Sequence, residues 1–344
     1  MINYPVCYYH INNKGKIKKY RITLTDSYTD TIPVIKMQGQ NIAAKENLTV
    51  ISAASKAGKT ALVQVFIAGL LSSNKTQYSF ESFEFIPNDE GFAMVHFDTE
   101  QSPTHQQKFI KNVVKRAGLE LMPDCFLSYN IRDIHYEEYI EIVNVICEEA
   151  AIQFKGVHSI FIDGGADFLR SVNDDVASKT IIQFFTKLSV KHNCPVFIIV
   201  HTNPTNTTNS KERGHFGSDL QRKCYSVINI KKEDKISTAY TKFMRDGEEG
   251  VTTSYQWSSD AEMHVECEQD FVLKNKDEAQ CYECIQPLDV FTYTEFKANV
   301  MSKLKLKDRA AEGRISRWLE ANFVFHGNDK RYRKTVKSIE DATV

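Results

Sequence analysis

The stretch LTVISAASKAGKTALVQVF, residues 48–66, decides the fold of this chain. Residues 48–52 form an apolar run typical of a fully buried strand, and the pattern from residue 59 to residue 73 predicts a helix. The turn between strand and helix is formed by Ala53, Ala54, Ser55, Lys56, Ala57, Gly58, Lys59 and Thr60. Because backbone N–H groups and the positive end of the helix meet at such a turn, it predicts a phosphate-binding loop.

The residue types in this loop suit a nucleoside triphosphate and its Mg²⁺ ion. Gly58 allows a turn without a Cβ atom, Lys59 can reach the β- and γ-phosphates, and the Thr60 hydroxyl can ligate Mg²⁺. Ala53 stands where the motif has its first glycine. Its methyl group is tolerated if φ is negative, and otherwise narrows the turn and weakens binding. The alternative is a chance Gly-Lys-Thr at the start of a helix.

The segments that follow alternate between strands and helices. Because the predicted strands are apolar throughout, we expect a mainly parallel α/β sheet covered by helices on both faces. Past residue 224, three β segments predict an antiparallel extension of the same sheet. The predicted strands are 92–97, 159–162, 196–200, 224–230, 238–244 and 251–257, and the predicted helices are 103–117, 136–154 and 176–192.

Asp163 and His201 each end one of these strands, at the edge where a parallel sheet places its binding site. Asp163 is expected to bind the Mg²⁺ ion on the phosphates, although an aspartate at a strand end is also a common turn former. His201 can contact the γ-phosphate, and the alternative for this histidine is a structural role.

Glu100 follows the strand at 92–97, which we expect to lie next to the phosphate-loop strand. A carboxylate at that edge would face the γ-phosphate and polarise the attacking water, and Glu100 is favoured over Asp98 for this role. The alternative is a cap for the next helix, for which Ser102 suffices.

The order and spacing of these motifs resemble the RecA-fold ATPases, in particular the RepA-like and DnaB-like branch of plasmid replication helicases and ATPases of mobilisable elements. The resemblance covers roughly residues 33–257. It implies binding and hydrolysis of ATP with Mg²⁺, a glutamate base at Glu100 and a phosphate sensor at His201. It also implies action on DNA as a homo-oligomer, such as a hexameric ring.

The same resemblance implies two further groups of residues. It places DNA-contacting loops at residues 202–213, with Lys211 and Arg213, and at residues 164–175. It also makes Lys242 and Arg245 candidates for reaching the nucleotide of a neighbouring subunit, where an arginine neutralises charge during phosphoryl transfer. A solvated pair at a strand end is the alternative for Lys242 and Arg245.

Four parts are expected along the chain. Residues 1–32 are a β-rich lead-in, residues 33–258 the RecA-like domain, residues 259–285 a linker, and residues 286–344 a small winged-helix-like domain of two helices and a hairpin. In the last part, Arg314 and Arg317 are predicted on the outward face of the recognition helix, and Lys330 and Arg331 on the wing. A protein-docking module is the alternative, since winged helices serve that purpose too.

Charge and cysteine content narrow the class of protein. The net charge is −1, so the whole chain lacks the signature of a nucleic-acid binder, yet residues 285–344 carry 12 Lys/Arg against 8 Asp/Glu. No apolar run approaches the roughly 20 residues of a membrane span, and no signal peptide is evident, so we expect a cytoplasmic protein. The 8 cysteines are scattered as in a reduced protein. His264, Cys267, Cys281 and Cys284 have zinc-site spacing, which the RecA resemblance does not imply.

Two functions follow from these expectations. The first is a DNA-dependent ATPase, a helicase or translocase in the replication or mobilisation of a genetic element. The second is a nucleotide-gated DNA-binding regulator with little or no turnover, which Ala53 favours. A P-loop kinase is less favoured, because no segment resembles an acceptor-binding lid.

Overall fold

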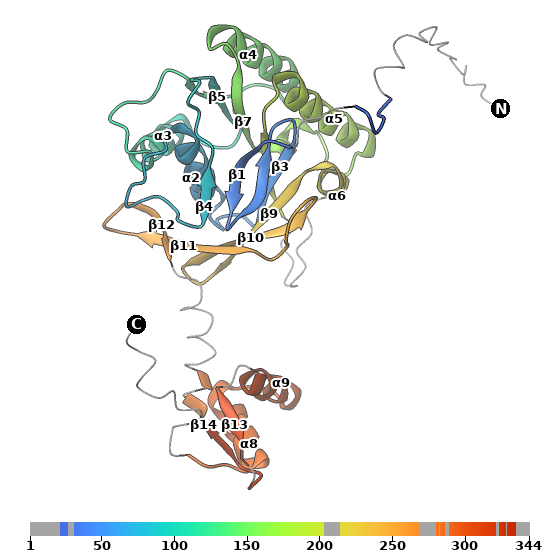
Figure 1. The fold of residues 1–344 in the computed structure, drawn as a ribbon. Coiled ribbons are helices and arrows are strands. Elements are labelled where there is room, and N and C mark those ends of the chain that lie inside the picture. The colour runs from blue at the N-terminus through green and yellow to red at the C-terminus, as the bar shows by residue number, and fades with distance from the viewer. Residues whose placement is uncertain are drawn as a thin grey trace, which may run out of the picture.

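The computed structural model describes residues 21–26, 31–202, 214–267, 280–281, 283–285, 289–320, 323–327 and 329–334. The larger body is built on a central sheet flanked by helices, and a smaller body follows it in the chain (Figure 1). Lys211 and Arg213 lie outside the described residues, so their predicted role stays a prediction. Among the described helices, none is long and apolar enough to cross a membrane.

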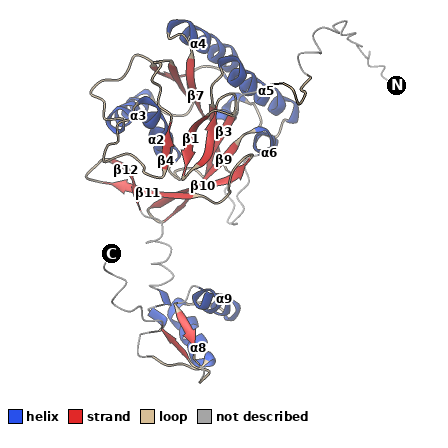
Figure 2. Cartoon of the chain, viewed as in Figure 1, coloured by secondary structure: helices blue, strands red, loops and turns tan. Residues whose placement is uncertain are grey.

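The central sheet has nine strands in the order β12-β11-β10-β9-β3-β8-β7-β5-β6. The six strands from β9 to β6 run parallel, and the three from β10 to β12 run antiparallel (Figure 2). Its strands are β3 (Leu48–Ala53), β5 (Ala93–Asp98), β6 (Phe126–Asn130), β7 (Val157–Asp163), β8 (Val196–His201), β9 (Ser226–Glu233), β10 (Ile236–Met244), β11 (Thr252–Ser258) and β12 (Met263–Cys267).

Helices cover both faces of this sheet, because its parallel strands are apolar on both sides. The helices α2 and α3 pack with a three-stranded sheet, β2-β1-β4, over one hydrophobic core, and α4, α5 and α6 pack over the other (Figure 1). These elements are β1 (Pro33–Met37), β2 (Gln40–Ala44), β4 (Phe83–Phe85), α2 (Lys59–Leu71), α3 (Pro103–Arg116), α4 (Tyr139–Gln153), α5 (Asp175–His192), α6 (Gly214–Lys223) and the 3₁₀ turns η1 (Tyr136–Glu138) and η2 (Gly165–Phe168).

The predicted fold class is confirmed: the chain is α/β, with a large, mainly parallel sheet and an antiparallel extension, which is consistent with a RecA-like core. Three details differ. First, β9 pairs in parallel with β3, so the antiparallel part starts only at β10. Second, β5 was predicted to lie next to β3, but β8 and β7 lie between them. Third, β12 continues the sheet into the stretch expected to be a linker.

The smaller body contains two helices and a hairpin, in the predicted order. They are α8 (Tyr293–Leu304), α9 (Asp308–Glu320), β13 (Val324–His326) and β14 (Tyr332–Lys334). A capping box starts α8, where the Thr292 side chain and Glu295 bond reciprocally. Trp318 and Phe296, both fully buried, lie at the centre of a separate hydrophobic core. The body therefore has a core of its own, and its division from residues 259–285 stays a prediction.

Candidate functional site

The phosphate loop lies between β3 and α2, where the sequence placed it. Gly58 caps α2 with φ 101°, and no side chain occupies the cap and no acidic residue lies in the first turn. The first N–H groups of the helix are thus free of an internal competitor for an anion. A Cβ atom on Gly58 would lie 2.8 Å from Oγ of Ser237 and 3.0 Å from the Tyr255 ring. The loop is a cradle that only glycine permits at this position.

Ala53 does not distort this loop. It is the last residue of β3, pairs with His201 of β8 and Ile230 of β9, and has no positive φ. An extended backbone of this kind accepts any L-residue without strain. The replacement of the motif's first glycine by alanine therefore leaves the loop geometry intact, and it no longer argues for weak nucleotide binding.

Two side chains from the antiparallel extension contact the loop, and sequence reasoning missed both. The hydroxyl of Tyr255 on β11 donates to the carbonyl oxygen of Gly58 at 3.1 Å, and the ammonium group of Lys232 on β9 lies 3.4 Å from the carbonyl oxygen of Lys56. Tyr255 is fully buried, and burial raises its pKa well above the usual range. No motif marks these residues, because their place depends on how β9, β10 and β11 fold back beside β3.

Lys59, His201 and Glu100 form a hydrogen-bonded chain at the carboxyl ends of three strands. Nζ of Lys59 lies 3.0 Å from Nδ1 of His201, and Nε2 of His201 lies 3.0 Å from Oε1 of Glu100. Because an ammonium group can only donate, Nδ1 of His201 accepts from Lys59 and the N–H at Nε2 donates to Glu100. The structure thus brings together the predicted phosphate-binding lysine, sensor and base.

The environment of this chain of residues shifts the pKa values of its two ends. Burial lowers the pKa of Lys59, which is 8% exposed, while the nearby carboxylates of Asp163 and Glu100 oppose this change. The hydrogen bond from His201 lowers the pKa of Glu100, with burial opposing it. Glu100 is therefore held as a carboxylate, the form that can accept a proton from water.

Asp163 and Asp98 lie side by side at the ends of β7 and β5, where the strand register pairs them. Burial, reinforced by the carboxylates of Asp98 and Glu100, raises the pKa of Asp163 to about 7. Burial also raises the pKa of Asp98, although that carboxylate accepts hydrogen bonds from the backbone N–H groups of Glu100 and Gln101. The sequence predicts Asp163 as a ligand of Mg²⁺ and offers Asp98 only as the less favoured alternative to Glu100.

The donor groups fit the predicted ligands. Two hydroxyl or carboxylate oxygens, from Thr60 at the start of α2 and Asp163 at the end of β7, are the hard ligands that Mg²⁺ prefers. The glycine cradle and the helix N-terminus suit phosphate oxygens. A triphosphate with Mg²⁺ is thus compatible with the residues present.

A cleft of about 610 Å³ opens beside Glu100 and His201. Its other wall is formed by residues 164–173, which belong to the segment 164–175 that the RecA resemblance implies as a DNA-contacting loop. The polar or charged side chains of this wall include those of Asp167, Arg170 and Asn173. The hydroxyl of Thr99 donates to Asp167 at 2.6 Å, which ties this wall to the segment that carries Glu100.

Lys242 and Arg245 are not part of this cluster. The strand β10 runs antiparallel to β9, with Met244 opposite Ser226 and Ser226 opposite Thr49. The end of β10 is therefore at the edge where β3 begins, roughly 13 Å along the sheet from Ala53. Arg245 donates at 3.5 Å to the carbonyl oxygen of Lys223. These two residues do not serve the phosphate loop of their own chain.

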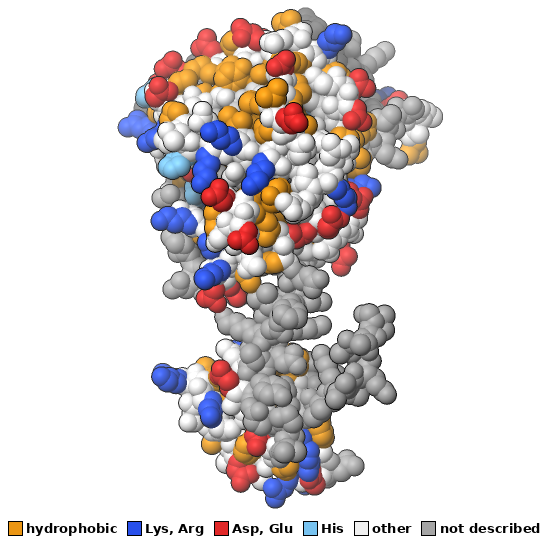
Figure 3. Space-filling model, turned by 90° about the vertical axis from the view of Figure 1, so that its left-hand side faces the viewer, with side chains coloured by type: hydrophobic (Ala, Val, Ile, Leu, Met, Phe, Trp, Pro, Cys, Tyr) orange, Lys and Arg blue, Asp and Glu red, His pale blue; other side chains and the backbone are white. Residues whose placement is uncertain are grey.

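The basic residues of the smaller body differ in exposure. Arg317, Lys330 and Arg331 are exposed. Arg314, predicted on the outward face of α9, is instead half-buried and donates to the side chain of Gln280. The outward face of α9 thus carries Arg317 but not Arg314. On the face drawn in Figure 3, Lys and Arg side chains are interspersed with Asp and Glu, so no field of one sign covers it.

The cysteines and histidine with zinc-site spacing are not brought together. His264 and Cys267 lie on β12, where the His264 ring meets Tyr255 and Trp257 edge-on. Cys281 and Cys284 are buried in the core of the smaller body. Among the described residues, these four form no metal-binding group.

No family model matches the chain, and no curated protein matches it. Among solved structures, the crystal structure of the RadB recombinase is similar, with a TM-score of 0.46 and 16% sequence identity over 67% of this chain and 95% of that chain. A likeness of this degree carries no argument about activity. The class of protein rests on the phosphate loop and on the residues around it.

Proposed function

We propose that this chain is a RecA-like ATPase that binds ATP with Mg²⁺ and hydrolyses it in response to DNA. The observation that carries the proposal is the hydrogen-bonded chain from Lys59 through His201 to Glu100, directly beyond a phosphate loop. It joins a phosphate-binding cation, a contact for the γ-phosphate and a carboxylate base in one constellation.

The residues of the chain divide the chemistry among them. The backbone N–H groups from Gly58 to Thr60 bind phosphate oxygens, and Lys59 turns from His201 toward the phosphate. Glu100 then orients and deprotonates the attacking water, while His201 contacts the γ-phosphate and registers its loss. Bound Mg²⁺ supplies charge neutralisation for the phosphates, and Thr60 and Asp163 would hold it.

The proposed action on DNA is that of a helicase or translocase in the replication or mobilisation of a genetic element, working as a homo-oligomer such as a hexamer. Support comes from the cleft wall at residues 164–173, which adjoins Glu100 and His201 and carries the exposed Arg170. The exposed Arg317, Lys330 and Arg331 offer further phosphate contacts on a winged-helix-like unit.

The second candidate is a nucleotide-gated DNA-binding regulator. The mutual contact of Lys59 and His201 favours it, since a resting site of this kind suits a protein that changes state on binding ATP. Ala53 no longer supports it, because its backbone is unstrained.

ATP hydrolysis with and without single-stranded DNA separates the two candidates. The wild type is compared with Lys59→Ala and Glu100→Gln, and with the exposed control variants Lys108→Ala and Glu120→Gln on and just after α3. We expect DNA-stimulated turnover that both site variants lose and both controls keep. Tight ATP binding without turnover would establish the regulator instead. Strand displacement on a forked duplex then distinguishes a helicase from a DNA-stimulated ATPase.

A further inference from the structure

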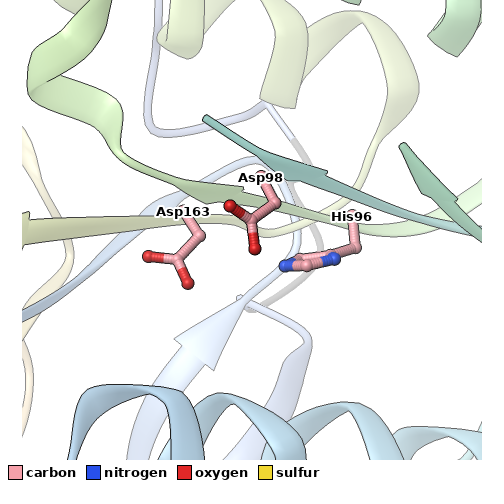
Figure 4. A group of neighbouring side chains, drawn as sticks. All are labelled: His96, Asp98 and Asp163. Atoms are coloured by element: carbon pink, nitrogen blue, oxygen red, sulfur yellow. The ribbon is translucent and has the colours of Figure 1, made fainter. Parts of the chain in front are cut away.

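Three titratable side chains meet at the carboxyl ends of β5 and β7. His96, Asp98 and Asp163 each offer a ligand atom, and these atoms all lie within 4.8 Å of one another (Figure 4). His96 and Asp98 are two residues apart on one strand and so share a face of the sheet, and the register sets Asp98 beside Asp163. The exposed fractions of the three are 0%, 0% and 6%.

Two atoms of this group lack a hydrogen-bond partner within the described part of the chain. They are Nε2 of His96 and Oδ2 of Asp98. Figure 4 shows the far ring nitrogen of His96 directed toward Asp98, with the carboxylate of Asp163 beyond. Buried polar atoms in native proteins almost always have a partner, so two orphans aimed at one point indicate that something binds there.

Two of the three ligands, Asp98 and His96, are held in place on the side that faces away from the group. Oδ1 of Asp98 accepts from the backbone N–H groups of Glu100 at 2.9 Å and Gln101 at 2.7 Å. Nδ1 of His96 lies 2.9 Å from Oγ of Ser128, and its ring stacks on Phe109. Metal sites are built in this way, with one atom of each ligand fixed by the surroundings and the other left for the ion.

We infer that His96, Asp98 and Asp163 bind a divalent transition-metal ion of the class of Mn²⁺, Co²⁺ or Zn²⁺. One imidazole and two carboxylates suit these ions, whereas Mg²⁺ prefers oxygen ligands alone. With metal–ligand distances of about 2.0–2.2 Å, the ligand atoms lie roughly 3–4 Å apart, which small side-chain rotations reach from the present spacing. An ion also compensates two carboxylates that burial would otherwise leave facing each other.

This site adjoins the proposed magnesium site, with which it shares Asp163, and its binding of an ion does not depend on ATP turnover. Asp163 has two oxygens and contributes to both sites, whereas His96 and Asp98 belong to the new one alone. A single proton held by the pair of Asp98 and Asp163 is the competing explanation of how two neighbouring carboxylates are tolerated in a buried place. It predicts no metal binding in the absence of nucleotide.

The first test uses the full-length chain, stripped of metal by a chelator and free of nucleotide. Mn²⁺ is titrated in, and the bound ion is followed by electron paramagnetic resonance with detection of nitrogen modulation. We expect one Mn²⁺ per chain with the nitrogen coupling of an imidazole. Absence of binding, or binding without a nitrogen coupling, would overturn the proposal.

Variants assign the nitrogen. We expect His96→Gln to remove the coupling, and to weaken Mn²⁺ binding by more than about tenfold, and Ser128→Ala to weaken it by about 10- to 100-fold by releasing the ring. The matched control is His158→Gln, a half-buried histidine of β7 outside the group, which keeps both. Unchanged binding in His96→Gln contradicts the inference; if that variant does not fold, the wild-type spectrum and Ser128→Ala decide.

Lys59→Ala is expected to retain Mn²⁺ binding while it loses ATP binding. This variant therefore separates failure of the metal site from failure of the ATPase proposal.

Discussion

Lys59 of the phosphate loop donates a hydrogen bond of 3.0 Å to Nδ1 of His201 on the neighbouring strand β8. Each of the two side chains is therefore the hydrogen-bond partner of the other. A phosphate that recruits Lys59 must break this bond. His201 also holds Glu100 through its other nitrogen. Binding of a phosphate to Lys59 is thereby coupled to the hydrogen bond between His201 and the proposed base, Glu100. Only the side chains of Lys59, His201 and Glu100 need to move.

Replacement of this histidine should separate binding from hydrolysis. In His201→Ala, Lys59 loses its partner and remains available to phosphate, so ATP affinity is kept or increased. Glu100 loses the hydrogen bond that orients it, and turnover should fall on the order of 100-fold or more. Equilibrium binding of a fluorescent ATP analogue and steady-state hydrolysis measure the two effects. Equal losses in affinity and turnover would mean that His201 acts only in binding.

The glycine that caps α2 should tolerate no side chain. Gly58→Ala places a methyl group 2.8 Å from Oγ of Ser237 at a φ of 101°, which costs about 1–3 kcal/mol and displaces the loop. We expect a lowered free energy of unfolding in urea and loss of ATP binding. Gly313→Ala in α9 is the matched control, because nothing lies within 4 Å of its new methyl group. That change should stabilise its helix by about 0.5–1 kcal/mol. If Gly58→Ala lowered neither the free energy of unfolding nor ATP binding, as expected for Gly313→Ala, the loop would not require glycine at residue 58.

Asp163 should make the larger body less stable as pH rises. Its pKa of about 7 in the folded chain lies above the usual 3.8, so the folded state binds the extra proton between these values. The contribution of Asp163 to the free energy of unfolding is therefore greatest below about pH 4, and it is lost as the pH rises to 7. At 1.4 kcal/mol per pKa unit, the loss is at most about 4 kcal/mol. Urea unfolding of metal-free protein between pH 5 and 8 measures it.

In Asp163→Asn this pH dependence should be largely removed, and the metal-free chain should be more stable than the wild type at pH 8. The substitution keeps the shape of the side chain and abolishes its charge. An identical pH slope in variant and wild type would show that Asp163 is not the group that titrates.

The two tryptophans allow the two bodies to be followed separately. Trp257 on β11 is 50% exposed, whereas Trp318 is fully buried in the smaller body. In Trp257→Phe, the fluorescence of Trp318 alone should report the unfolding of the smaller body, and ATP binding should be unaffected. Trp318→Ala should cost that body about 3–5 kcal/mol, again without effect on ATP binding. Coincident transitions in both variants would show that the bodies unfold as one unit.

The parallel half of the fold was predictable because its strands are buried on both sides and read as uninterrupted apolar runs. The phosphate loop was predictable for a similar reason, since strand, glycine and helix start adjoin one another in sequence. The place of β5 was not, because strand order is a tertiary property that local pattern does not determine. The strand β12 was not predictable either. It is half-buried and has polar residues at alternate positions, and such a composition is nearly the same in a linker and in an edge strand.

Site residues divide along the same line. Asp163 and His201 each end a buried strand and Glu100 follows one by two residues, so the sheet edge brings them together and the sequence can predict them. Tyr255 and Lys232 reach the loop only through the pairing of β9, β10 and β11, and His96 points into the site from inside β5. In the sequence His96 is one more residue of a buried strand, and only the register with β7 reveals what it faces.

The antiparallel course of β10 bears on how copies of this chain can meet. Arg245 and the phosphate loop lie at opposite edges of one sheet, so any nucleotide that Arg245 reaches belongs to another chain. A contact of this kind joins two different surfaces, head to tail, and repeats from each copy to the next. Whether the series closes on itself or continues as a helical filament then depends only on the rotation between successive copies.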